Sequence, residues 1–148
     1  MKNTTLSYQT ATVNFLEKFD SYWNDTIRIM GIQSAQLSTG NRLRPQICFW
    51  GYLATVNPDV VISHDYSTVA NVAVSIEMIH KASLLIDDWI DNDNQRHGEP
   101  TFHVEYDSQQ AVLFALNMIG NAMERLKNVF SGTVILPQNY LPMLEHNN

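Results

Sequence analysis

The chain has 148 residues but only one cysteine, Cys48, and it lacks both a basic stripe and a long apolar run. A single cysteine excludes an internal disulfide and favours a reducing, cytoplasmic location. The formal net charge of −6 and the missing basic stripe argue against a nucleic-acid partner. No run of about 18 apolar residues occurs, so we expect no transmembrane segment. The polar start, MKNTTLSYQT, has no apolar core of signal-peptide length.

Alternating strand patterns are nearly missing and internal repeats are not found, whereas helical spacing runs through most of the chain. Hydrophobic residues make up 45% of the sequence and charged residues 16%, which is typical of a folded globular domain. Apolar residues recur at three- and four-residue steps, as on one face of a helix. This spacing predicts four main helices, over residues 8–30, 45–56, 68–89 and 109–130. The expected fold class is therefore all-α.

Polar residues separate these predicted helices. Asp65 and Ser67 are candidate caps of the third helix and Ser108 of the fourth, because their side-chain oxygens can accept hydrogen bonds from the first turn. Residues 92–107 are predicted to form a loop with a short helical turn. We expect one helical domain over residues 1–130 and an irregular C-terminal tail over residues 131–148, where the periodicity ends.

The third predicted helix ends in three aspartates, Asp87, Asp88 and Asp91, directly after the apolar run 84–86. Positions three and four apart share a helix face, so the three carboxylates can converge. Carboxylates held this close repel one another, and the helix C-terminus adds to the repulsion. A divalent cation relieves it, and oxygen ligands without cysteine or paired histidine favour Mg²⁺ or Mn²⁺ over zinc. A solvated acidic helix end is the alternative interpretation.

Arg96 follows the aspartates within the same short loop. Its guanidinium presents a fixed fork of donors that matches a phosphate group bidentately. Mg²⁺ is usually bound in proteins by one or two carboxylates together with the phosphates of a substrate. The aspartates and the arginine together therefore predict a site where Mg²⁺ bridges a diphosphate to the helix end.

Two segments of the sequence resemble one known family, the trans-isoprenyl diphosphate synthases, or polyprenyl synthetases. SIEMIHKASLLIDDWIDNDNQRHGEPTFH, residues 75–103, resembles the first aspartate-rich region of that family. GNRLRP, residues 40–45, resembles its upstream GKRxRP motif. The two motifs are specific together, and the resemblance covers roughly residues 10–128. It implies a helical bundle like the first half of the isoprenoid synthase fold.

The resemblance implies a Mg²⁺-dependent prenyltransferase of isoprenoid biosynthesis. In the family, aspartates at the positions of Asp87, Asp88 and Asp91 bind the metal and, through it, an allylic prenyl diphosphate. Arg96 would hold the same diphosphate. The diphosphate leaves, and isopentenyl diphosphate attacks the allylic cation that remains. Metal and arginine stabilise the departing negative charge.

The resemblance also implies roles for residues on the acceptor side and in product length. Arg44 and His80, and with them Arg42 of the upstream motif, would bind the diphosphate of isopentenyl diphosphate. Ala82 and Ser83 occupy the positions that govern prenyl chain length in the family. Both are small, which favours a product or ligand of geranylgeranyl length or longer.

The sequence departs from the family pattern at several points. Asn41 stands where GKRxRP has its lysine, and His97 stands where the family has the second arginine of an Arg-Arg-Gly motif. Each change removes a cation that would face the acceptor diphosphate. A hydrogen bond to a charged group contributes roughly 1.5–3 kcal/mol, so each change would weaken acceptor binding by about that amount. The second aspartate-rich motif of the family is missing, because Glu124 and Glu145 are the only acidic residues after Asp107.

Three interpretations therefore stay open. In the first, the chain is a prenyltransferase whose acceptor is either isopentenyl diphosphate or a peptide. A peptide acceptor has no diphosphate and would not need the charges lost at Asn41 and His97. Alternatively, it is a non-catalytic or incomplete subunit that binds prenyl diphosphate or completes a site with a partner chain, as a homo- or hetero-oligomer. The third interpretation is a fragment that keeps the motifs without the function.

Overall fold

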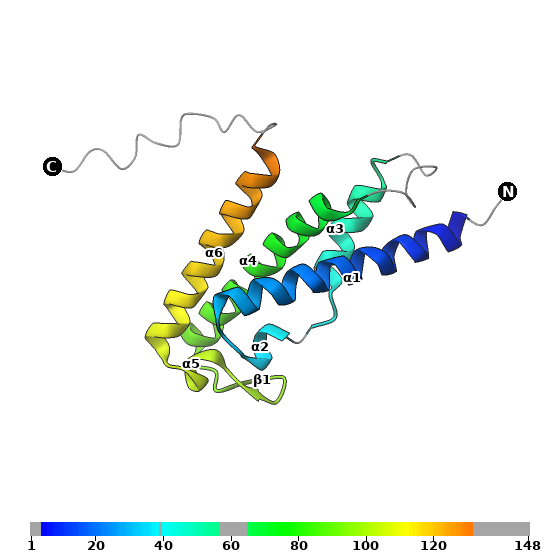
Figure 1. Cartoon of the computed structure of the whole chain (residues 1–148). Helices are drawn as coiled ribbons and strands as arrows, with labels where there is room; N and C mark the ends of the chain where they lie inside the picture. The colour runs from blue at the N-terminus through cyan, green and yellow to red at the C-terminus, as the bar shows by residue number, and fades with distance from the viewer. Residues whose placement is uncertain (1–3, 39, 57–64, 132–148) are drawn as a thin grey trace.

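The structure, a computed structural model, describes residues 4–38, 40–56 and 65–131. In this part of the chain long helices form a bundle, and α4 runs through its middle (Figure 1). The all-α prediction is confirmed, with one small hairpin as the exception. The elements are α1 (Thr4–Met30), α2 (Ala35–Ser38), α3 (Leu43–Leu53), α4 (Ser67–Asp91), β1 (Gln95–Arg96), β2 (Glu99–Pro100), α5 (Phe102–Glu105) and α6 (Ser108–Phe130).

Helix α4 is the core helix of the bundle and packs against α6, α3 and α1. Its residues Ala70, Ala73, Val74 and Ala82 are fully buried, and side chains this small let neighbouring helices approach closely. By length and composition α4 is apolar enough to cross a membrane, but 56% of its apolar stretch is buried inside the fold. Core packing therefore accounts for the apolar run that precedes the aspartates.

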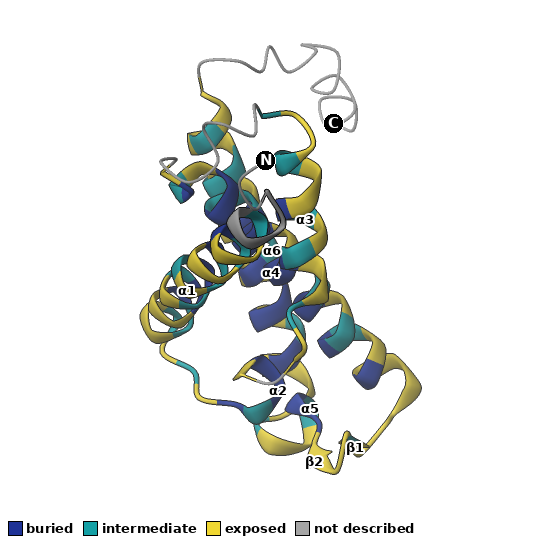
Figure 2. Cartoon of the chain, turned by 90° about the vertical axis from the view of Figure 1, so that its right-hand side faces the viewer, coloured by how far each residue is buried: buried dark blue, intermediate teal, exposed yellow. Residues whose placement is uncertain are grey.

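Aromatic side chains join α1 and α3 above α4. The rings of Phe15 and Phe49 stack with their centroids 4.3 Å apart, and Tyr66 meets Phe49 edge-on at 5.1 Å. Trp23 is buried and donates its indole N–H to the carbonyl of Leu37, 3.2 Å away. Figure 2 shows buried residues on the inward faces of these helices and exposed residues on their outer faces. These contacts hold α3 and the α2 segment against α1.

Two local predictions need correction. The residue that caps α6 is Asp107, whose Oδ1 accepts from the Gln110 N–H at 2.7 Å, whereas Ser108 is already the first helical residue. Residues 92–107 contain a β-hairpin as well as the predicted helical turn. The sequence did not predict the hairpin, because strands of two residues show no alternating pattern. The predicted tail over 131–148 lies, beyond its first residue, outside the described residues.

Phe49 should be essential for stability, since its ring is fully buried and contacts aromatic rings of α1 and of the residue before α4. We expect Phe49→Ala to lower the free energy of unfolding by about 3–5 kcal/mol, measured by urea denaturation. Trp50→Ala is the matched control, because the adjacent Trp50 is 50% exposed and should cost less than about 1 kcal/mol. Equal losses in the two variants would contradict this packing.

Candidate functional site

The aspartates lie where α4 ends, and the way it ends directs the chain back toward them. Asn92 follows the helix in the left-handed conformation with φ 56°. The Asp93 N–H donates to the Asp88 carbonyl at 2.9 Å and the Asn92 N–H to the Trp89 carbonyl at 3.3 Å, which is a Schellman motif. Asparagine tolerates this conformation better than most residues. The chain therefore reverses sharply after Asp91.

The β1–β2 hairpin then brings Arg96 to the helix end. Its strands pair antiparallel, with Gln95 opposite Pro100 and Arg96 opposite Glu99. His97 (φ 54°) and Gly98 (φ 84°) form the two-residue turn, and two positive φ values match a type I′ hairpin. Glycine adopts a positive φ without steric cost, so Gly98 favours this tight turn.

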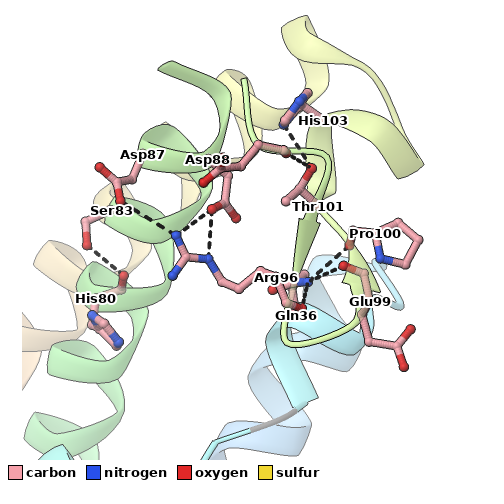
Figure 3. Close-up of polar contacts among 11 residues, drawn as sticks. Gln36, His80, Ser83, Asp87, Asp88, Arg96, Glu99, Pro100, Thr101 and His103 are labelled. Atoms are coloured by element: carbon pink, nitrogen blue, oxygen red, sulfur yellow. Dashed lines mark hydrogen bonds and ion pairs between the residues drawn. The ribbon is translucent and has the colours of Figure 1, made fainter. Parts of the chain in front are cut away.

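Asp88 and Arg96 form the central ion pair of the site (Figure 3). Arg96 Nε donates to Asp88 Oδ1 at 2.8 Å, and Nη2 contacts the same oxygen. The side chain of Asp88 is 1% exposed and that of Arg96 is 25% exposed. Asp87 Oδ2 lies 3.6 Å from Nη2. The hydrogen bond to Asp88 is the main cause that raises the pKa of the Arg96 guanidinium above its usual value.

The three predicted metal ligands are not equivalent in the structure. Asp88 is buried, whereas the side chain of Asp87 is 63% exposed and Asp91 is exposed. Among the described residues no group of three or more histidine, cysteine, aspartate or glutamate side chains stands ready to hold a metal ion. The predicted convergence is therefore seen for Asp87, Asp88 and Arg96, but not for Asp91.

Asp88 nevertheless has one oxygen suited to a cation. Its Oδ2 is buried and has no hydrogen-bond partner. Buried carboxylate oxygens are almost always paired, so an unpaired one needs an explanation. A hard divalent cation prefers oxygen ligands and would satisfy it, with the exposed Asp87 and Asp91 carboxylates available nearby in sequence. The donor chemistry of these residues thus fits Mg²⁺ or Mn²⁺, although in the described residues three such ligands do not converge.

A cavity of about 500 Å³ lies beside this end of α4, between the α2–α3 segment and the hairpin. Four cationic side chains line it, together with two glutamates and two histidines. The cations are Arg42, Arg44, Lys81 and Arg96, and the other ionisable groups are Glu77, Glu99, His80 and His97. The excess of arginine and lysine over glutamate makes the cavity suited to an anion.

The predicted substrate residues divide into those that line this cavity and those that do not. Arg44, His80, Arg42 and Arg96 line it. Ala82 is fully buried, and Ser83 is exposed with its hydroxyl donating to the His80 carbonyl at 2.8 Å. Their proposed influence on prenyl length stays a prediction.

Arg42 lines the cavity, but most of its side-chain contacts are with α1. Its Nε donates to Asp20 Oδ1 at 3.0 Å, and its guanidinium lies over the rings of Phe19 and Trp23, 5.4 and 5.7 Å from their centroids. Nη1 is buried without a hydrogen-bond partner. That nitrogen is the part of Arg42 suited to an anion, while the rest of the side chain fixes the start of α3.

Lys81 is a site residue that the sequence reasoning missed. It is 7% exposed, and its Nζ donates to the Gln36 carbonyl at 2.7 Å. Burial is the main cause that lowers the pKa of its ammonium, opposed by Glu77 and aided by nearby arginines. Lys81 lies four residues after Glu77 and seven before Asp88, which places all three on one helix face. That spacing was the available signal.

Comparisons with known proteins show the family to which the chain belongs. The family model described as Polyprenyl synthetase matches residues 29–146, so the chain belongs to the polyprenyl synthetase family. This match continues past residue 128, where the sequence motifs predicted the resemblance to end. Geranylgeranyl pyrophosphate synthase 10, mitochondrial, of Arabidopsis thaliana is 35% identical over 91 residues. The short chain isoprenyl diphosphate synthase of Methanocaldococcus jannaschii is 28% identical over 115 residues.

Solved structures confirm the fold resemblance. A geranyltransferase of Helicobacter pylori matches 84% of this chain with a TM-score of 0.66 and 26% identity. A second structure from that organism, complexed with magnesium and isoprenyl diphosphate, matches 93% with a TM-score of 0.64 and 25% identity. The two structural matches span 47% and 46% of those chains. The match to the Arabidopsis relative covers 60% of this chain and 24% of the relative. The match to the Methanocaldococcus relative covers 78% of this chain and 31% of the relative. The chain therefore spans less than half of the relatives' length.

The pKa of His80 gives a test of the electrostatics of the cavity. Burial, then Arg44, lower it below its ordinary value of 6.5. The unfolded chain then binds more protons at this site, so the stability due to His80 is constant above pH 6.5 and falls as the pH drops through the folded value. We expect an NMR titration to give a pKa below 6.5, with His80→Gln identifying the signal and removing this part of the pH dependence. A pKa at or above 6.5 would contradict the combined effect of burial and Arg44 on His80.

Proposed function

We propose that the chain binds the diphosphate of an allylic prenyl substrate at the end of α4, as the allylic half of a prenyltransferase site. The observation that carries the proposal is the buried Asp88 carboxylate, with one oxygen held by Arg96 and the other unpartnered, beside a cationic cavity. Membership of the polyprenyl synthetase family supports it. A structural relative in complex with magnesium and isoprenyl diphosphate also supports it.

The proposal gives each residue of the helix end a separate role. Asp88, Asp87 and Asp91 hold Mg²⁺ or Mn²⁺, which when bound neutralises part of the charge of the diphosphate. Arg96 donates to the diphosphate oxygens and offers a bidentate fork. The buried position of Asp88 keeps its carboxylate fixed, whereas the exposed Asp87 and Asp91 can adjust to the ligand.

The reaction that these groups favour is cleavage of the bond between allylic carbon and diphosphate oxygen. The diphosphate leaves with the bonding electron pair, and the Arg96 guanidinium stabilises the negative charge that develops. An acceptor donates an electron pair to the allylic carbon and then loses a proton. The same charge stabilisation serves a carbon acceptor such as isopentenyl diphosphate and a peptide acceptor.

The cavity favours an acceptor that carries a phosphate or diphosphate. Arg44 and Lys81 line it, although Asn41 and His97 lack the charges found in the family at their positions. Isopentenyl diphosphate is therefore our first choice of acceptor, and a peptide is the second. A cytoplasmic location remains part of the proposal, on the basis of the single cysteine.

The test is calorimetric titration of farnesyl diphosphate into the purified chain, first with Mg²⁺ and then with EDTA. We expect binding with Mg²⁺ and its loss with EDTA. Asp88→Asn should weaken binding at least about tenfold, since one charged hydrogen bond contributes roughly 1.5–3 kcal/mol. Asp25→Asn, at an exposed carboxylate of α1 paired with Arg28, is the matched control and should bind normally. Equal binding with Mg²⁺ and with EDTA would exclude the metal-bridged site.

One observation favours the second candidate, a subunit that needs another chain. Helix α6 buries Ala111, Ala115, Met118 and Ala122, yet its opposite side is also apolar. That side is a heptad-spaced stripe, with 38–66% of each large apolar side chain exposed. The large apolar residues of the stripe are Leu113, Leu116, Met123 and Phe130. One relative, 33% identical over 103 residues, is described as the large subunit of a heterodimeric geranylgeranyl pyrophosphate synthase.

We propose that this stripe of α6 packs against a second copy of the chain. Sedimentation should then give twice the mass of a single chain, and Leu116→Lys should shift the chain to the monomer without unfolding it. Val13→Lys, at a similarly exposed apolar residue of α1, is the control and should leave the dimer intact. A monodisperse wild-type monomer would rule out self-association through α6.

A further inference from the structure

Gln36 of the short helix α2 is hydrogen-bonded to the hairpin that carries Arg96 (Figure 3). It is 8% exposed, although it is polar. Its side-chain Nε2 donates toward three main-chain carbonyls, those of Arg96 at 3.3 Å, Pro100 at 3.1 Å and Glu99 at 3.5 Å. One carboxamide therefore contacts both strands of the hairpin.

The main chain of Gln36 is fixed in turn by α4. Its carbonyl accepts from Lys81 Nζ at 2.7 Å, in a buried hydrogen bond. Lys81 Nζ also lies close to the main chain of Gly40, 3.8 Å from the position that a Cβ would take there. Lys81 thus holds the α2–α3 segment against α4, and Gln36 carries that attachment on to the hairpin.

The hairpin needs such an attachment. Each of its strands has two residues, and isolated two-stranded hairpins are marginally stable even at greater length. The Arg96 guanidinium reaches α4 at the far end of a flexible side chain, while the Gln36 amide holds the Arg96 carbonyl itself. The main chain of Arg96 can therefore stay in place while its guanidinium exchanges a carboxylate for another anion.

We propose that Gln36 is a positioning residue for Arg96, which fixes the hairpin so that the guanidinium meets Asp88 and, in the bound state, the diphosphate. The first part rests on the geometry alone, and the second rests on the function proposed above. Neither the family motifs nor the sequence patterns pointed to this residue, which lies four positions before Gly40.

The first experiment needs no ligand and follows the Arg96 Nε–H signal by ¹⁵N NMR, with Arg96→Lys identifying it. Gln36→Met keeps the length of the side chain and removes the donor. It should shift or broaden the Arg96 signal and speed amide exchange across residues 95–100 about three- to tenfold, as expected for one lost hydrogen bond. Gln33→Met, at an exposed glutamine just before α2, should change neither.

A second variant keeps the test decisive if Gln36→Met is unstable. Gln36→Glu preserves the side-chain shape and places an acceptor against the three carbonyls, so it should displace the Arg96 signal further. A folded Gln36 variant with wild-type Arg96 signal and hairpin exchange would overturn the proposal.

The second experiment measures the affinity for Mg²⁺–pyrophosphate in a double-mutant cycle. Gln36→Met should weaken binding several-fold in the wild-type chain and have no further effect in Arg96→Met, because Gln36 acts through Arg96. Additive losses would mean a general structural effect and would overturn the functional part. If the wild-type chain binds no pyrophosphate, the proposed function fails, while the Arg96 signal still decides whether Gln36 positions the arginine.

Discussion

The buried ion pair between Asp88 and Arg96 is the interaction on which the site depends. A carboxylate with 1% exposure requires a compensating charge, since an unpaired buried charge is strongly destabilising. The chain supplies that charge from eight residues further on, through the reversal after Asp91, the tight turn at His97 and Gly98, and the attachment of the hairpin to α2. Together these three local features return Arg96 to the end of α4.

The same pair has the properties of a resting state for the proposed ligand. Asp88 needs a cation and Arg96 needs an anion, and in the described chain each satisfies the other. A metal-bound diphosphate would carry both kinds of charge, so in the proposed bound state neither residue would be left unpaired.

Much of this arrangement could be predicted from the sequence, because helical spacing and the aspartate-rich segment are local signals. The main helices and the family resemblance followed from them. What could not be predicted depends on burial. The pattern treats Asp87, Asp88 and Asp91 alike, whereas packing buries one and exposes two. Gln36 lies outside the family motifs and Lys81 has no assigned role within them, and only the fold brings Lys81 Nζ to the Gln36 carbonyl.

The two sides of the cavity differ in how completely this chain builds them. The proposed allylic side has an ion pair, exposed carboxylates and a fixed hairpin within one short segment. On the proposed acceptor side two positions lack the cations of the family, and Lys81 adds a charge at a different place, deeper along α4. In the proposed site, the ammonium of Lys81 would compensate for part of the charge that Asn41 lacks, because Lys81 also lines the cavity. A second chain packed on α6 would bury its apolar stripe, so acceptor binding and assembly are separable requirements that act on different faces of the bundle.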